Sequence, residues 1–288
     1  MKKWTVLFLA VATAISLAAC GSTEKVGNNN AQTSAGSGAK EASAAVPTVE
    51  ELIEKTAKAS TELKSFTMDS KVNQNMVMEQ GDQKQEQNID MTMKTDFVKE
   101  PLQVYQEIQM KIPQGEQAIK QYITTEGIYT ETNGTWMKLP NEMKDQIMAG
   151  MKASLEPEKQ MEQFKKIVSD TKIVEEGNDY VMSAELSGDN VKELAKDLMS
   201  QAGAGAGAGE QATAMLDSMN IKSLKIQSAV NKETYLPTRS VVNMSMEMEQ
   251  EGQKVALNME MTSTVYKHNE VGEITVPQEA LNAATVQQ

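Results

Sequence analysis

Methionine residues recur in pairs two positions apart along the chain. The sequence has 21 Met, whereas Phe, Trp and Tyr make up only 4% of it. Thioether sulfurs are soft ligands that suit Cu(I), so a copper site is one interpretation of the pairs. We favour an apolar sheet face, because Met is adaptable and these residues alternate with polar ones, as Ile and Leu do on neighbouring segments. The spacing groups Met76/Met78, Met91/Met93, Met244/Met246/Met248 and Met259/Met261.

Other residues capable of chemistry are few. His268 is the only histidine, and it has neither a second His nor a free Cys as a zinc partner. Nothing around Ser245 or Ser263 resembles the nucleophile turn of a Ser-His-Asp triad. The 40 acidic residues supply many carboxylate pairs, but no segment of the sequence singles out one pair as the acid and base of glycoside hydrolysis. We therefore expect no enzyme activity, metal or cofactor, and we interpret His268 as a surface residue near a strand end.

The only cysteine, Cys20, follows Leu17-Ala18-Ala19. Lys2 and Lys3 precede an apolar run that is shorter than the roughly 20 residues of a membrane-spanning helix. This pattern is the lipobox of bacterial lipoprotein signal peptides; an ordinary secretory signal with a chance cysteine is the alternative. In lipobox chemistry Cys20 takes a diacylglycerol, residues 1–19 are removed, and two acyl chains hold the protein stably. We therefore expect a lipid anchor at the extracytoplasmic face of the cell membrane.

The charge excludes several partners. Loss of residues 1–19 removes two lysines, so the formal net charge of −12 becomes −14. A chain this acidic is repelled by nucleic acid and by anionic lipid surfaces. With Cys20 lipidated, no thiol remains for a disulfide or a Cys-based metal site.

Helices are predicted at the start and in the middle of the chain. Residues 20–47, rich in Gly, Ser, Ala and Asn, are typical of a disordered tether. Thr48-Val49-Glu50-Glu51 forms a capping box that begins a helix ending near Lys64. Gly203 to Gly209 alternates with Ala and lacks the Lys-Ser/Thr of a phosphate loop, so it predicts a break between helical pieces. Further helices are expected at 141–152, 157–169, 189–199 and 210–219.

From Phe66 onward the apolar period is two, which predicts strands with one buried face. Gln80-Gly81-Asp82, Asn133-Gly134 and Glu251-Gly252 mark turns between such strands. A short strand followed by a terminal turn or helix is expected at 274–283. The longer strands are predicted at 66–78, 89–97, 102–112, 119–123, 127–132, 135–139, 172–176, 180–186, 223–231, 240–249 and 255–265.

Two hairpins have similar sequences. The nine residues from Met76 resemble the nine from Met246, at an offset of 170 residues. Duplication of a unit spanning 48–139 and 189–267 explains this similarity, and convergence of two polar turns between Met-rich strands explains it equally well.

Several segments together resemble a known group. These are the lipobox, the tether, "LKSF" at the end of the first helix, "GIYTETNGTWMKLP" at Gly127–Pro140 and "ITVPQEALNA" at Ile274–Ala283. They resemble uncharacterised lipoproteins of Bacillus-like Gram-positive bacteria and, in layout only, the LolA/LppX/LprG-type carriers. That resemblance implies a half-open barrel with helices over its concave face, which holds acyl chains. It transfers no functional residue.

The sequence thus predicts one α+β domain over 48–283, followed by a tail at 284–288. Its core would be a curved antiparallel sheet of about ten strands with helices across the concave face. We expect a non-enzymatic carrier or sensor of a lipid or other amphiphile, since Met-rich surfaces repack around varied ligands. The alternative is a structural lipoprotein with a filled core that binds an envelope protein. The predicted cavity is lined by Met76, Met78, Met91, Met93, Ile108, Met110, Met244, Met246, Met259 and Met261.

Overall fold

The computed structural model describes residues 46–81, 83–112, 115–154, 168, 171–188, 191, 219–250 and 253–285. The predicted signal peptide, Cys20 and nearly all of the tether lie outside the described residues. So do the Gly203–Gly209 segment and the helices predicted at 157–169, 189–199 and 210–219, apart from Val168, Val191 and Met219.

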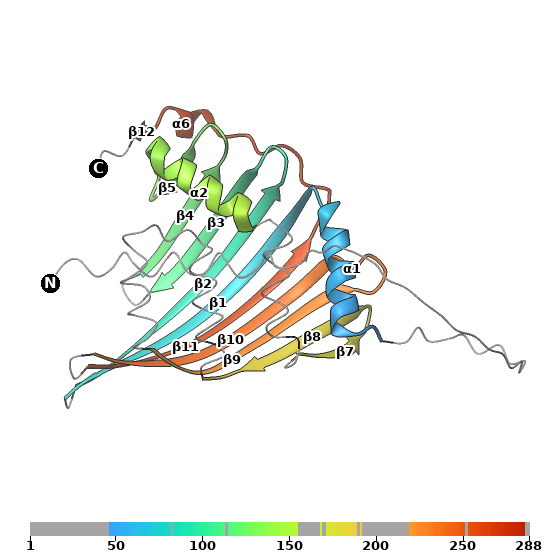
Figure 1. Ribbon diagram of the computed structural model, residues 1–288. Coiled ribbons are helices and arrows are strands. Elements are labelled where there is room, and N and C mark those ends of the chain that lie inside the picture. Colours follow the sequence, from blue (N-terminus) through green and yellow to red (C-terminus); the bar gives the residue numbers. More distant parts are fainter. Residues whose placement is uncertain are drawn as a thin grey trace, which may run out of the picture.

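One open sheet dominates the described part of the chain (Figure 1). Its strand order is β12-β6-β5-β4-β3-β2-β1-β11-β10-β9-β8-β7, so β1 and β11 meet in the middle. The neighbours from β6 to β7 in this order are antiparallel, and β12 joins β6 in parallel. The predicted α+β class with a large curved antiparallel sheet is confirmed. The strands are β1 (Ser65–Gln80), β2 (Gln83–Val98), β3 (Gln103–Ile112), β4 (Gly115–Ile123), β5 (Ile128–Thr132), β6 (Thr135–Lys138), β7 (Thr171–Glu176), β8 (Asp179–Leu186), β9 (Met219–Asn231), β10 (Pro237–Gln250), β11 (Gln253–Tyr266) and β12 (Ala284–Thr285).

The register places apolar residues of neighbouring strands on a common face. Phe66 pairs with Phe97, and Val72 pairs with both Met91 and Met261. We call the side of the sheet that bears Phe66 the inner face and the opposite side the outer face. Alternate residues of each strand point to opposite sides, so the predicted period-two pattern fixes which residues face inward.

Helix α1 (Val49–Thr61) covers one part of the inner face. The predicted capping box is confirmed, because the Thr48 hydroxyl accepts from the Glu51 amide at 3.2 Å and the Glu51 carboxylate accepts from the Thr48 amide at 3.0 Å. Leu52 and Ile53 on its buried side pack against β8 and β9, where the cluster also contains Tyr180, Met182 and Val230.

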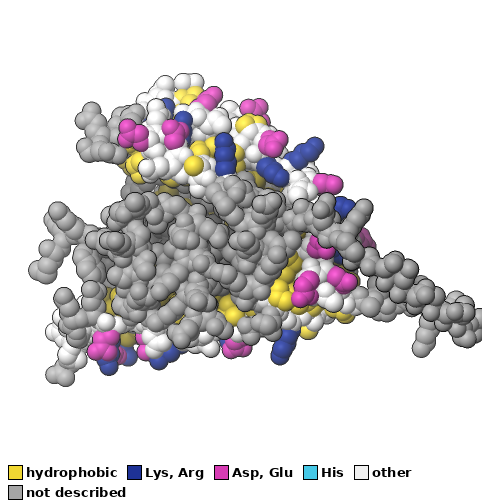
Figure 2. Space-filling model, in the orientation of Figure 1, with side chains coloured by type: hydrophobic (Ala, Val, Ile, Leu, Met, Phe, Trp, Pro, Cys, Tyr) yellow, Lys and Arg dark blue, Asp and Glu magenta, His cyan; other side chains and the backbone are white. Residues whose placement is uncertain are grey.

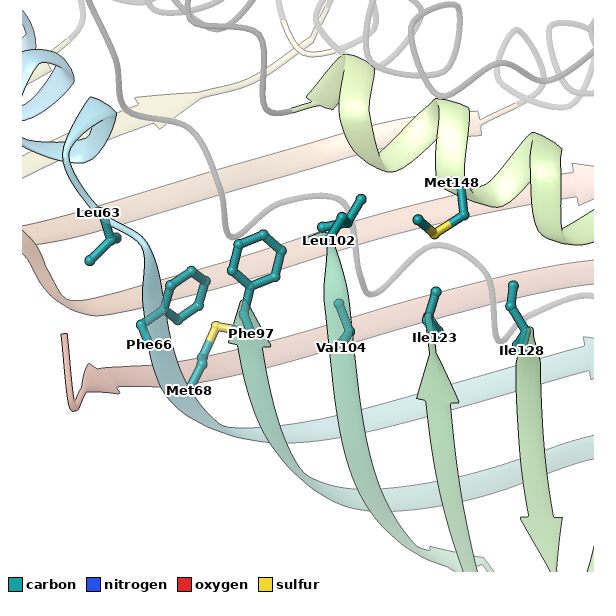
Figure 3. Packing of buried hydrophobic residues seen from close by; sticks show 9 residues of the cluster. All are labelled: Leu63, Phe66, Met68, Phe97, Leu102, Val104, Ile123, Ile128 and Met148. Carbon is teal, nitrogen blue, oxygen red and sulfur yellow. The ribbon is translucent and has the colours of Figure 1, made fainter. Parts of the chain in front are cut away.

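Helix α2 (Asn141–Ser154) covers another part of the inner face. Its Met148 lies over Ile123 and Ile128 at the ends of β4 and β5 (Figure 3). Figure 1 shows the sheet curving toward both helices, as the predicted architecture requires. The buried members of this cluster are Leu63, Phe66, Met68, Phe97, Leu102, Val104, Ile123, Ile128 and Met148.

The turn between β5 and β6 confirms its sequence signal. Asn133 and Gly134 have φ values of 52° and 80°, which are the two left-handed positions of a type I′ hairpin turn.

Gly127 precedes β5 and lies against the ring of Tyr129. A Cβ atom added at Gly127 would lie 2.7–2.8 Å from three atoms of that side chain, which is only 2% exposed. We therefore expect Gly127→Ala to lower the free energy of unfolding by about 1–3 kcal/mol, as overpacked sites do. Gly272→Ala is the matched control, since nothing lies within 4 Å of its added Cβ. Chemical denaturation of both variants measures the difference, and equal stabilities would contradict the packing seen at Tyr129.

The C-terminal segment differs in part from its prediction: the expected helix is present, and the expected strand is not. Residues 271–277 form no strand, the short helix α6 (Gln278–Leu281) comes first, and β12 follows within the residues expected to be a tail. The amide of Ile274 donates to the Gln103 side chain at 3.1 Å instead of to a neighbouring strand, and Pro277 caps the helix. The strand found here is instead β12, which pairs in parallel with β6.

The two similar hairpins are neighbours in the sheet. The first hairpin consists of β1 and β2, and the second consists of β10 and β11. Strands β1 and β11 pair along their length, and each hairpin has an ion pair near its turn. The Glu79–Lys84 distance is 3.4 Å, and the equivalent Glu249–Lys254 distance is 4.0 Å. Strand β9, not a helix, directly precedes the second hairpin. Duplication stays a prediction.

Candidate ligand-binding face

All ten residues predicted to line a cavity lie on the inner face. The register connects them across five adjacent strands, from β3 through β2, β1 and β11 to β10. Directly paired examples are Met91 with Met110, Met93 with Ile108, and Met244 with Met259. The sheet thus brings together, on one continuous surface, side chains that are up to 185 positions apart in the sequence, from Met76 to Met261.

These side chains differ in burial. Met93 and Met261 are buried, with 5% and 3% exposure, and the other eight are partly buried. Met91 and Met259 pack against a cluster of Val72, Val242 and Met261. Met246 packs against a second cluster of Leu186, Val191 and Ile221. Met91, Met246, Met259 and Met261 of the predicted lining therefore pack against other apolar side chains.

Charged side chains are confined to the outer face over most of the sheet. In β1–β6 and β8–β11 the register places the described Asp, Glu, Lys and Arg there, except Lys222. Lys222 lies at a register shift of β9 and forms an ion pair of 3.1 Å with Glu247 of the outer face. In Figure 2 the charged side chains of the sheet line the lower edge of the molecule, below yellow hydrophobic ones. Oppositely charged residues alternate along one outer row of paired positions, which favours the strand pairing. That row is Glu131, Lys120, Glu107, Lys94 and Asp69.

Aromatic rings gather beside this charged row. The ring centroids of Tyr105 and Tyr122 are 4.6 Å apart, and those of Tyr122 and Trp136 are 5.8 Å apart. The Tyr105 hydroxyl donates to Glu107. Burial, reinforced by this carboxylate, raises the pKa of Tyr105 above its ordinary value. Burial also raises the pKa of Tyr122, so the hydroxyl groups of Tyr105 and Tyr122 stay neutral across the physiological pH range and add no charge to the outer face.

A row of four serines interrupts the apolar inner face. Ser70, Ser263, Ser240 and Ser228 occupy directly paired positions on β1, β11, β10 and β9. The Ser70 and Ser263 hydroxyl oxygens are 2.8 Å apart and hydrogen-bonded. We call these residues the serine row. Sequence reasoning missed it, although each serine stands where the period of two expects an apolar residue.

Other candidate positions give no site. His268 is partly buried, and its Nε2 donates to the Pro237 carbonyl oxygen at 2.9 Å. Among the described residues, no three His, Cys, Asp or Glu side chains come together as metal ligands. A surface pocket of about 260 Å³ is lined by Glu51, Glu54, Lys55 and Lys58 of α1, and none of the ten predicted residues lines it. No helix in the described ranges is long and apolar enough to cross a membrane.

The family model described as "Family of unknown function (DUF6612)" matches residues 48–285. The chain belongs to this family. A search of the curated proteins gave no match.

Solved structures match over most of the chain at low similarity. Lipovitellin is 7% identical with a TM-score of 0.30, over 74% of this chain and 26% of that one. A DUF1329 family protein from Desulfovibrio piger is 11% identical with a TM-score of 0.22, over 71% and 88%. A putative outer membrane lipoprotein-sorting protein domain from Vibrio parahaemolyticus is 10% identical with a TM-score of 0.20, over 71% and 87%. At these TM-scores the likenesses assign neither a ligand nor a function to this DUF6612 chain.

Proposed function

We propose that this DUF6612 protein is a lipid-anchored, non-enzymatic carrier or sensor of an amphiphile at the extracytoplasmic face of the cell membrane. The acyl chains of the ligand would lie along the ten predicted residues of the inner face. Burial of each CH₂ group would contribute about 0.8 kcal/mol to binding. Movement of the helices that pack on this face would admit and release the ligand.

The sorting of side chains between the two faces carries this proposal. The inner face joins Met, Ile, Leu and Val side chains over adjacent strands, whereas the charges of those strands lie on the outer face. Eight of the ten predicted residues keep part of their surface exposed. Flexible thioethers suit a surface that must fit acyl chains of different shapes.

Native mass spectrometry tests the proposal directly. The chain from Gly21 onward, with Cys20 omitted, would be secreted from a Gram-positive host and measured before and after organic extraction. We expect a reproducible extra mass that extraction removes, and its value would name the ligand class. A clean mass, together with no uptake when membrane lipid is offered, would refute the carrier function.

A structural or interaction lipoprotein with a filled core is the second candidate. The packing of Met246 against Leu186, Val191 and Ile221 favours it, because a residue enclosed by apolar neighbours has less surface to offer a ligand. In that case the outer face would bind an envelope protein, and the mass measurement would give the bare chain only.

A further inference from the structure

The serine row has apolar side chains at both of its ends and before and after Ser70 on β1. Met93 pairs with Ser70 at one end, and Met182 pairs with Ser228 at the other. Two residues further along β1 in either direction stand Met68 and Val72. Four hydroxyls therefore form a polar row with apolar neighbours along and across the strands. Thr95 and Gln106 are also polar and lie on the inner face, where they bond to each other at 3.2 Å.

The serine row has unused hydrogen-bonding capacity. Each Ser hydroxyl can donate one hydrogen bond and accept two. The Ser70–Ser263 bond uses one of the four hydroxyl hydrogens. Ser240 and Ser228 are only partly buried, and neither side chain bonds to another described residue. Burying a hydroxyl without a partner costs free energy, so an incoming acceptor would be favoured here.

The position of the row fits a polar group in the middle of a long apolar molecule. On one side lies the cluster of Phe66 and Phe97 beneath α2, and on the other lies the cluster of Val72, Val242 and Met261. Paired strands are about 4.8 Å apart, so the four hydroxyls form a line of roughly 14 Å. An acceptor-only group with hydrocarbon beside it, such as an ester carbonyl, matches this line of donors.

The charge distribution argues for an uncharged ligand. A carboxylate or phosphate in an apolar setting needs a cation beside it. The described cations of the four strands that carry the row, Lys71, Lys222, Lys225, Arg239 and Lys254, are exposed and belong to the outer side of the sheet. An ester brings no charge and requires none.

We propose that the serine row binds the ester carbonyls of an uncharged acylglycerol, while its acyl chains lie along the Met-rich strands. This inference rests on the carrier function proposed above and adds the chemical class of the ligand. Recognition is by hydrogen bonds from the Ser240 and Ser228 hydroxyls to carbonyl oxygens. The Ser70–Ser263 pair borders the same site.

A matched pair of lipids tests this recognition. The chain from Gly21 onward would be incubated with phosphatidylcholine vesicles that contain either labelled 1,2-dioleoylglycerol or its diether analogue, which lacks both carbonyls. Protein-bound label would be counted after the vesicles are removed. We expect an ester-over-ether preference of about tenfold, the effect of one or two hydrogen bonds.

The serine variants assign that preference to the row. Ser240→Ala/Ser228→Ala should remove the preference by lowering uptake of 1,2-dioleoylglycerol to that of its diether analogue. Ser245→Ala is the control, because Ser245 lies on the outer face of β10 and bonds to Asn258 at 2.8 Å. It should keep the full preference.

The outcomes separate the two proposals. Failure of the wild-type chain to take up either lipid would overturn the carrier function. Uptake of both lipids without a preference, or a preference that survives in the double variant, would overturn the serine-row proposal alone. The wild-type comparison decides the point even if the double variant does not fold.

Discussion

Met246→Asp/Met259→Asp is expected to abolish uptake of acyl lipid by the protein. Both side chains lie on the inner face, within the region proposed to contact acyl chains. A carboxylate placed against hydrocarbon without a cation costs several kcal/mol. A loss of about 3 kcal/mol lowers the affinity by about a hundredfold. Uptake of labelled 1,2-dioleoylglycerol from vesicles measures the loss.

The matched control carries the same two charges on the same strands. Asn243 on β10 and Asn258 on β11 are exposed on the outer face. Asn243→Asp/Asn258→Asp should therefore take up lipid as the wild-type chain does. Circular dichroism of both double variants checks that the sheet is retained. Normal uptake by the Met246/Met259 variant would remove these residues from the binding surface.

Sequence periodicity predicted the strands and their faces because, within each strand, apolar residues of the buried face alternate with polar residues of the exposed face. In β1 the even-numbered residues from Phe66 to Met78 are mostly apolar, and the register places them all on the inner face. The capping box at Thr48 and the turn at Asn133-Gly134 were equally local, since side-chain bonding and φ preference act within a few residues. These parts of the fold needed no knowledge of the rest of the chain.

The serine row depends on pairing between strands that are far apart in the sequence, and the periodicity of a single strand does not predict which strand it pairs with. Strand β1 pairs with β11, so Ser70 meets Ser263 at a separation of 193 residues. Within its own strand each serine is one small residue among apolar ones, and only the strand order joins the four into a row. The same limit applies to β12, whose two residues are held by parallel pairing with β6 and carry no pattern of their own.

Leu52→Ala should cause the largest loss of stability among simple truncations in α1. Leu52 is fully buried and packs in the cluster of Ile53, Tyr180, Met182 and Val230, which joins the helix to β8 and β9. Removing a buried Leu side chain to Ala typically costs about 2–5 kcal/mol, because contacts are lost and a cavity remains.

Leu281→Ala is the matched truncation, because Leu281 in α6 is 39% exposed. We expect it to cost well under half as much as Leu52→Ala, since exposed side chains lose little contact area on truncation. Urea denaturation of the two variants, followed by circular dichroism, gives both free energies of unfolding. Similar losses would mean that α1 is not held to the sheet through Leu52. A large loss at Leu52 alone would show that its burial against β8 and β9 contributes several kcal/mol to the stability of the fold.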